Sequence, residues 1–151
     1  MGCCCSFVDS SANNGGGGGA VFNPTAIPEQ FAQNNVVAGQ ANVALSTQVS
    51  INFDDWKSCR AGSLIGFATR LTEAITAGTL TVELTINGAG TGFMIVHTSV
   101  SNASGGVAVQ ASGLDAYVAG DRIGARLTTD AGFLPITTDL EVTVVEVLEA
   151  L

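Results

Sequence analysis

Apolar and polar residues alternate along most of the chain after residue 36. The clearest run covers residues 79–86, where apolar side chains alternate without a fault with Thr and Glu. Its apolar positions are Leu80, Val82, Leu84 and Ile86. A period of two places successive side chains on opposite faces of a β-strand. Asn87-Gly88 follows directly, and this pair predicts a tight hairpin turn.

The last strand of the pattern covers residues 140–148. Leu140, Val142 and Val144 share one face, and Glu146 interrupts this inward set. From Val144 onward both faces become apolar, because Val145 and Val147 stand opposite Leu148. A strand that is apolar on both faces is expected where a second surface, such as a neighbouring subunit, covers it.

Residues 93–98 form another strand that is apolar on both faces. Together with shorter runs between turn signals, the pattern gives about eight strands, and no segment has a helical period. The sequence therefore predicts an all-β protein, an antiparallel β-sandwich of the jelly-roll type, over residues 36–151.

Residues 1–35 differ from the rest, with a run from Gly15 to Gly19 and two prolines soon after it. Such a segment builds no core of its own and is either a disordered tail or an extended arm that orders on a partner. We predict an anchoring arm, because apolar residues are scattered through it. The predicted anchors are Cys3, Cys4, Cys5, Phe7, Phe22, Ile27 and Phe31.

Three adjacent cysteines, Cys3 to Cys5, stand near the start of this segment. Adjacent cysteines do not easily bridge one another, so the alternatives are bridges between chains and reduced thiols; we expect reduced, buried thiols, as in a particle assembled in a reducing cytoplasm. Gly2 with Ser6 fits the myristoylation pattern, but no polybasic patch follows to supply a second membrane signal. We expect no membrane partner.

Charge is sparse and mostly negative. Charged residues make up 12% of the chain and hydrophobic residues 46%, which favours burial of surface between subunits. The formal net charge of −8 would repel a phosphate backbone, so nucleic acid is not an expected partner. We predict a homotrimer whose interface draws on the strands that are apolar on both faces. The predicted interface residues are Phe93, Ile95, Val145, Val147 and Leu148.

Candidate catalytic, metal-binding or ligand-binding residues are few. The single histidine, His97, lies within an apolar strand and is expected to be packed rather than catalytic. The turn aspartates lack the spacing of a calcium loop, and no zinc-ligand pairs occur. Trp56 is either an aromatic contact to a sugar or a core or interface residue. We therefore predict no enzyme activity, no metal and no cofactor.

Three stretches resemble a class of phage virion and bacterial surface domains. They are residues 61–66 (AGSLIG), 77–88 (AGTLTVELTING) and 119–129 (AGDRIGARLTT). The domains are trimeric jelly rolls of the C1q and tumour-necrosis-factor type, found on head fibres, decoration proteins and tail fibres. The resemblance covers roughly residues 45–151 and implies a virion structural protein, a decoration or head-fibre trimer on the capsid surface. We expect the arm, which the resemblance does not cover, to bind capsid proteins. The alternative is a receptor- or glycan-binding tip of a tail fibre or surface adhesin, with a host-surface glycan as partner.

Overall fold

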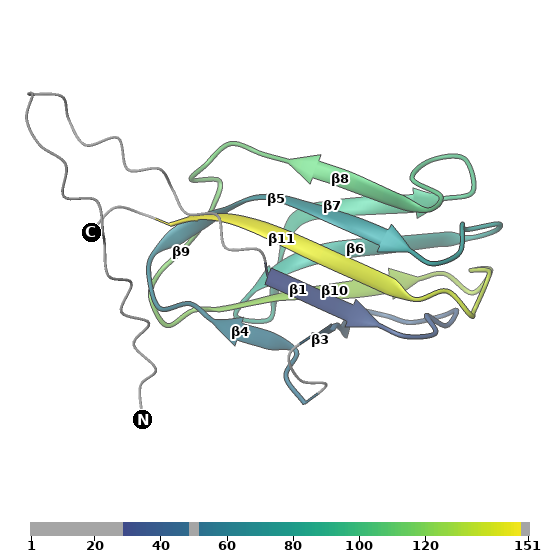
Figure 1. Cartoon of the computed structure of the whole chain (residues 1–151), viewed down its shortest axis with the longest axis horizontal. Coiled ribbons are helices and arrows are strands. Elements are labelled where there is room, and N and C mark those ends of the chain that lie inside the picture. The colour runs from purple at the N-terminus through teal and green to yellow at the C-terminus, as the bar shows by residue number, and fades with distance from the viewer. Residues whose placement is uncertain (1–28, 49–51, 149–151) are drawn as a thin grey trace, which may run out of the picture.

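The protein is built from β-strands packed in two sheets (Figure 1). The computed structural model describes residues 29–48 and 52–148, and within these ranges it contains eleven strands and no helix. The strands are β1 (Glu29–Gln33), β2 (Val43–Ala44), β3 (Ser46–Thr47), β4 (Asp55–Lys57), β5 (Gly62–Leu71), β6 (Thr79–Ile86), β7 (Ala89–Thr98), β8 (Gly105–Val109), β9 (Asp115–Tyr117), β10 (Arg122–Thr129) and β11 (Leu140–Leu148). All pairings are antiparallel.

The strands divide between two sheets that we call sheet A and sheet B. Sheet A has the order β3-β1-β11-β5-β8, with β9 also paired to β5. Sheet B has the order β2-β10-β6-β7, with β4 also paired to β10. The first and last described strands are neighbours within sheet A, and the chain crosses between sheets at most connections. This confirms the predicted antiparallel β-sandwich of jelly-roll type.

The predicted hairpin joins β6 to β7 in sheet B. Asn87 and Gly88 both have positive φ, 53° and 77°, as a two-residue hairpin turn of this hand requires. Asn87 tolerates this conformation because its side chain is short and polar. That side chain also holds the turn to the residue before the neighbouring strand β10, since Asn87 Nδ2 donates to Asp121 Oδ1 over 2.8 Å.

The core lies between the inner faces of the two sheets. Its members follow the alternation of the sequence; from β6, β10 and β11 they are Leu80, Val82, Leu84, Ile123, Ala125, Leu127, Leu140, Val142 and Val144. Phe67 of β5 and Phe93 of β7 join the sheets through an edge-to-face contact with ring centroids 5.0 Å apart. Such contacts stabilise the sandwich beyond simple burial of area.

Phe31, predicted as an anchor in the arm, is instead a core residue. It lies in β1, stands opposite Val142 of β11 and is 0% exposed. Val36 is buried in the same core. Residues 29–35 therefore already belong to the sandwich, and any separate arm is confined to the residues before Glu29. The other predicted anchors, from Cys3 to Ile27, lie outside the described residues.

Phe93 and Ile95, predicted at a trimer interface, also face the core. They are 9% and 4% exposed, whereas the alternating residues Met94 and Val96 are exposed. The pairing of β7 with β6 decides which face is inside, because Ile95 stands opposite the fully buried Val82. The exposed apolar side of β7 is thus the one that carries Met94 and Val96.

Candidate functional site

A buried carboxyl group occupies the end of the sandwich where β11 stops. Glu146 of β11 is 0% exposed, although it is an acidic residue. Tyr117 of β9 donates its hydroxyl to Glu146 Oε2 over 2.6 Å, and the Trp56 indole of β4 donates Nε1–H to Glu146 Oε1 over 3.4 Å. β4 and β9 both lie at this end of the molecule (Figure 1). Each carboxyl oxygen therefore has its own donor, which is what a buried polar group requires.

A second acidic residue, Glu29, faces the same end of the core. It stands opposite Val144 in the register of β1 and β11, so its side chain shares the inner face with that of Glu146. Among the described residues neither carboxyl group takes part in an ion pair; the two ion pairs found there join Arg122 to Asp55 and Arg126 to Glu83.

Burial controls the protonation of both groups. It raises the pKa of Glu146, although the hydrogen bonds from Tyr117 and Trp56 favour the charged form. Burial, with repulsion from Glu146, raises the pKa of Glu29 to about 7. Burial also raises the pKa of Tyr117, and its hydrogen bond to Glu146 acts in the same direction, so this hydroxyl stays a donor. The cluster therefore carries less negative charge near neutral pH than two ordinary carboxylates.

An open cleft adjoins this cluster on the outside. It has a volume of about 470 Å³ and is lined by Trp56 and Phe53 together with polar side chains, among them Glu29, Gln30, Gln48 and Asp55. A neighbouring cavity of about 420 Å³ shares the residues Thr47 and Gln48 with it. The two cavities therefore adjoin each other at Thr47 and Gln48.

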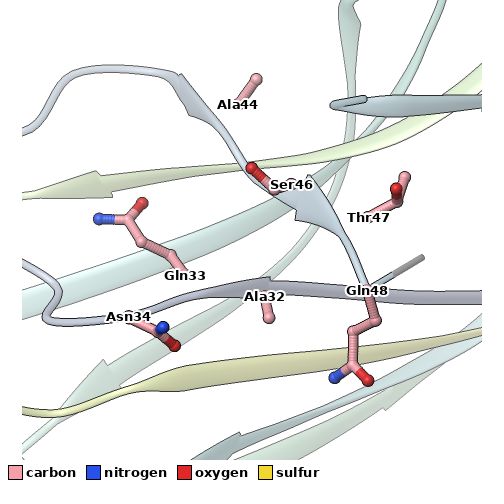
Figure 2. Close-up of a pocket in the computed structure, with 7 residues that line it drawn as sticks. All are labelled: Ala32, Gln33, Asn34, Ala44, Ser46, Thr47 and Gln48. Atoms are coloured by element: carbon pink, nitrogen blue, oxygen red, sulfur yellow. The ribbon is translucent and has the colours of Figure 1, made fainter. Parts of the chain in front are cut away.

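Figure 2 shows the second cavity between the stretch Ala32–Asn34 and the stretch Ala44–Gln48. The carboxamides of Gln33, Asn34 and Gln48 stand around it with the hydroxyls of Ser46 and Thr47. The lining of this part is uncharged, and besides these polar groups it includes Ala32 and Ala44. Its groups can both donate and accept hydrogen bonds.

A second surface of note is the outer face of sheet A. The register places Val109, Gly66 and Val145 in one row across β8, β5 and β11, and Val107 and Ala68 in the next row. We call these five residues the apolar face. Val107 and Val109 are 75% and 79% exposed. Thr143 continues the row of Val107 and Ala68 across β11, and Arg70 and Glu141 stand in the row after it, so the apolar face is bounded by charged residues on that side.

The remaining predicted interface residues, Val147 and Leu148, lie close to this face or to the core. Val147 follows Val145 on the same side of β11 and is half-buried. Leu148 packs against the edge of the core. Of the predicted set, Val145 and Val147 thus stand on the outer side of sheet A, and Phe93 and Ile95 do not.

His97 is packed inside the sandwich. Its Nε2 lies 3.1 Å from Thr69 Oγ1 and its Nδ1 lies 2.7 Å from the carbonyl oxygen of Asn102. Burial lowers the pKa of His97, against the opposing effect of the Asn102 carbonyl, so the ring stays neutral near pH 7. Its place is that of a hydrogen-bonded core residue that fixes the turn after β7.

Other features of the chain add no further site. The part of the chain that the structure describes contains no group of three or more His, Cys, Asp or Glu side chains able to hold a metal ion. Over the same residues no helix is long and apolar enough to cross a membrane.

Sequence reasoning identified Glu146 only as an interruption, and it missed Glu29 and Tyr117. An acidic residue at an inward position of an otherwise apolar strand is the signal that a buried partner must exist. Its partners, Trp56 and Tyr117, are distant in sequence and come from strands too short for their alternation to be informative.

Comparison with known proteins gives little beyond this geometry. No family model matches the chain, and no curated protein matches it. Among solved structures, one of the empty head of turnip yellow mosaic virus aligns with 96% of this chain and 89% of its own, at 13% sequence identity and a TM-score of 0.34. Function is therefore inferred from the residues and contacts of the chain itself.

Proposed function

We propose that the protein is a non-enzymatic structural protein of a virion, displayed on the capsid surface as a homotrimer of decoration or head-fibre type. The observation that carries the proposal is the apolar face of sheet A. Two of its three valines, Val107 and Val109, are exposed in a chain with a formal charge of −8, and an uncharged face is where two acidic copies of the chain approach with least repulsion.

The trimer assigned here uses two different surfaces of each copy. One is the apolar face, and the other is the exposed side of the edge strand β7, which carries Met94 and Val96. A contact between unlike surfaces closes into a ring when the rotation between neighbours is right. The jelly-roll strand order and the resemblance to trimeric virion domains support a three-fold ring.

The segment before Glu29 is proposed as the link to the capsid. Its apolar residues and cysteines supply small anchors for a capsid crevice, namely Cys3, Cys4, Cys5, Phe7, Phe22 and Ile27. An extended segment of this length reaches roughly 3.3 Å per residue, far enough to cross neighbouring capsid subunits.

Introducing a charge on the apolar face is expected to dissociate the trimer. Val107→Asp places a carboxylate at a position that is 75% exposed in the single chain, so the fold itself is expected to tolerate it. In the assembly the charge becomes buried without a partner, at a cost of about 3 kcal/mol or more per contact, which is at least a hundredfold in affinity. Light scattering after size-exclusion chromatography gives the mass directly.

The matched control is Ile136→Asp, an exposed apolar residue in the connection between β10 and β11, away from the apolar face. This variant is expected to remain a trimer. A wild-type protein that is monomeric at micromolar concentration, or a Val107→Asp protein that stays trimeric, would contradict the proposed interface.

Purified particles test the role of the protein on the virion. Mass measurement of intact particles is expected to give copy numbers in multiples of three. Particles stripped of the protein are expected to keep adsorbing to cells, because a decoration trimer does not carry the receptor contact. Loss of adsorption would instead favour the receptor-binding tip of a tail fibre or adhesin.

A further inference from the structure

The cleft beside Trp56 has aromatic walls where a surface groove would ordinarily be polar. Phe53 is 62% exposed, so most of its apolar surface gains nothing from burial within its own chain. Trp56 lines the same cleft with the part of its ring that is not buried against the core. Two aromatic surfaces at one opening give a ligand an apolar area to pack against.

The cleft is held in shape by the strands around it. The Trp56 backbone pairs with Ile123 of β10, and its indole N–H is fixed by the buried Glu146. The Phe53 carbonyl accepts a hydrogen bond from the Thr47 amide over 2.7 Å, and the Gln48 amide donates to the Gln30 carbonyl over 3.1 Å. Walls that are positioned in advance reduce the ordering cost of binding.

Polar groups surround the aromatic walls. The carboxamides of Gln30 and Gln48 line the cleft and make no side-chain hydrogen bond to other described residues. Glu29 and Asp55 add carboxyl groups. A carboxamide offers two donors and an acceptor within a few ångströms, which matches the neighbouring hydroxyls of a sugar ring.

We propose that this cleft is a binding site for a neutral saccharide, whose apolar ring face packs on Phe53 and Trp56 while its hydroxyls bind the carboxamides and carboxyl groups. The adjoining cavity, lined by Gln33, Asn34 and Ser46, extends the site for a second sugar unit (Figure 2). The site does not rest on the proposed trimer or on the proposed link to a capsid.

An organic cation fits the same aromatic walls less well, because the two carboxyl groups are largely compensated. Asp55 pairs with Arg122 at 3.4 Å, and burial keeps Glu29 partly protonated near neutral pH. Ring faces open to solvent attract a cation by only about 0.5–1 kcal/mol, so a strong cation site here would need uncompensated negative charge in addition. The cleft instead offers many uncharged donors and acceptors, which is the chemistry that recognises hydroxyl groups.

The test uses the full chain and its single tryptophan, Trp56, as the reporter. A printed array of neutral mono- and oligosaccharides selects binders, and each binder is titrated in solution while Trp56 emission is followed. We expect a saturable change in emission and tighter binding of disaccharides than of their monosaccharide units. Choline is titrated in parallel as the cationic alternative.

Two matched variants decide where the sugar binds. Phe53→Ala removes an exposed wall of the cleft and is expected to weaken binding about tenfold. Leu114→Ala removes a similarly exposed apolar side chain in the connection between β8 and β9 and is expected to bind as the wild type does. No binder on the array, a saturable response to choline alone, or equal affinities for the two variants would each overturn the proposal.

Discussion

Replacing Phe31 by alanine is expected to lower the free energy of unfolding by about 3–5 kcal/mol. Phe31 is 0% exposed and occupies the centre of β1, opposite Val142 of β11. Alanine leaves a cavity between the sheets that neighbouring side chains fill only in part. Urea unfolding measured by circular dichroism gives the midpoint and the slope from which this free energy is obtained.

The matched control is Phe53→Ala, the same chemical change at a position that is 62% exposed. It is expected to alter the free energy of unfolding by less than about 0.5 kcal/mol. Equal and small effects of the two substitutions would mean that β1 is not part of the folded sandwich and that Phe31 belongs to the arm, as the sequence pattern alone predicted.

The reason Phe31 was misplaced is the weakness of its local pattern. β1 has the sequence EQFAQ, with one large apolar residue in five positions, and it follows directly on a segment rich in Gly and Pro. Its strand character comes from pairing with β11, which is more than 100 residues away in the chain. Long-range pairing of this kind overrides local propensity, and no short window of sequence reports it.

Regular strands were predicted more accurately than strands with two apolar faces. In β6 the alternation leaves one possible inner face, and Leu80, Val82 and Leu84, which share that face, are core residues. In β7 both faces are apolar, and only the register with β6 assigns Ile95 inward and Met94 outward. Patterning determines the face only where polar residues mark the other side.

A local irregularity in β11 also could not be predicted from the sequence. Between Val145 and Glu146 of β11 the register with β5 shifts, so that Gly66 and Leu64 stand opposite successive residues and Ile65 is left over. A bulge of this kind turns the flanking side chains relative to their expected faces. It leaves Ile65 only half-buried, although a strict two-residue alternation with Phe67 and Leu71 would place it inward. The bulge therefore lies where Val145 of the apolar face and Glu146 of the buried carboxyl cluster follow each other along β11.

Replacing Glu146 in the buried carboxyl cluster is expected to cause the second large loss of stability. Glu146→Ala removes the acceptor of both the Tyr117 hydroxyl and the Trp56 indole, which lie 2.6 and 3.4 Å from the carboxyl oxygens. Each buried donor left without a partner costs about 1–3 kcal/mol, and the loss of the side chain adds a cavity, so we expect about 3–5 kcal/mol in total. Glu146→Gln keeps the shape and one acceptor oxygen, and is expected to cost less than about 1.5 kcal/mol at neutral pH.

The same cluster is expected to make the protein less stable as the pH rises from acid to neutral. In the unfolded chain a glutamate loses its proton near its ordinary pKa of 4.5, whereas in the folded protein Glu29 holds its proton to about pH 7. Between these values the folded state binds more protons, so the free energy of unfolding falls with increasing pH. This contribution is fully present below about pH 4.5 and is lost above about pH 7. The raised pKa of Glu146 acts with the same sign.

His97 acts with the opposite sign and has to be separated from the carboxyl cluster. Its lowered pKa means that the unfolded state binds more protons as the pH falls below the ordinary value of 6.5, so the folded protein loses stability on that side. The double variant Glu29→Gln with Glu146→Gln removes the carboxyl contribution and leaves that of His97. Its free energy of unfolding is therefore expected to rise, or stay level, from pH 5 to pH 8, roughly the range set by these groups.

Urea unfolding at intervals over this pH range measures both profiles. Relative to the double variant, the wild type is expected to lose stability steadily with rising pH. The reason is that its two inward carboxyl groups ionise near each other, and neither forms an ion pair with a described residue. Glu73→Gln, which removes an exposed carboxyl group outside the cluster, is expected to keep the wild-type profile. Parallel profiles for the wild type and the double variant would show that Glu29 and Glu146 are ionised in the folded protein as freely as in the unfolded chain, which is incompatible with the burial of Glu146 beside Tyr117 and Trp56 and of Glu29 on the same inner face.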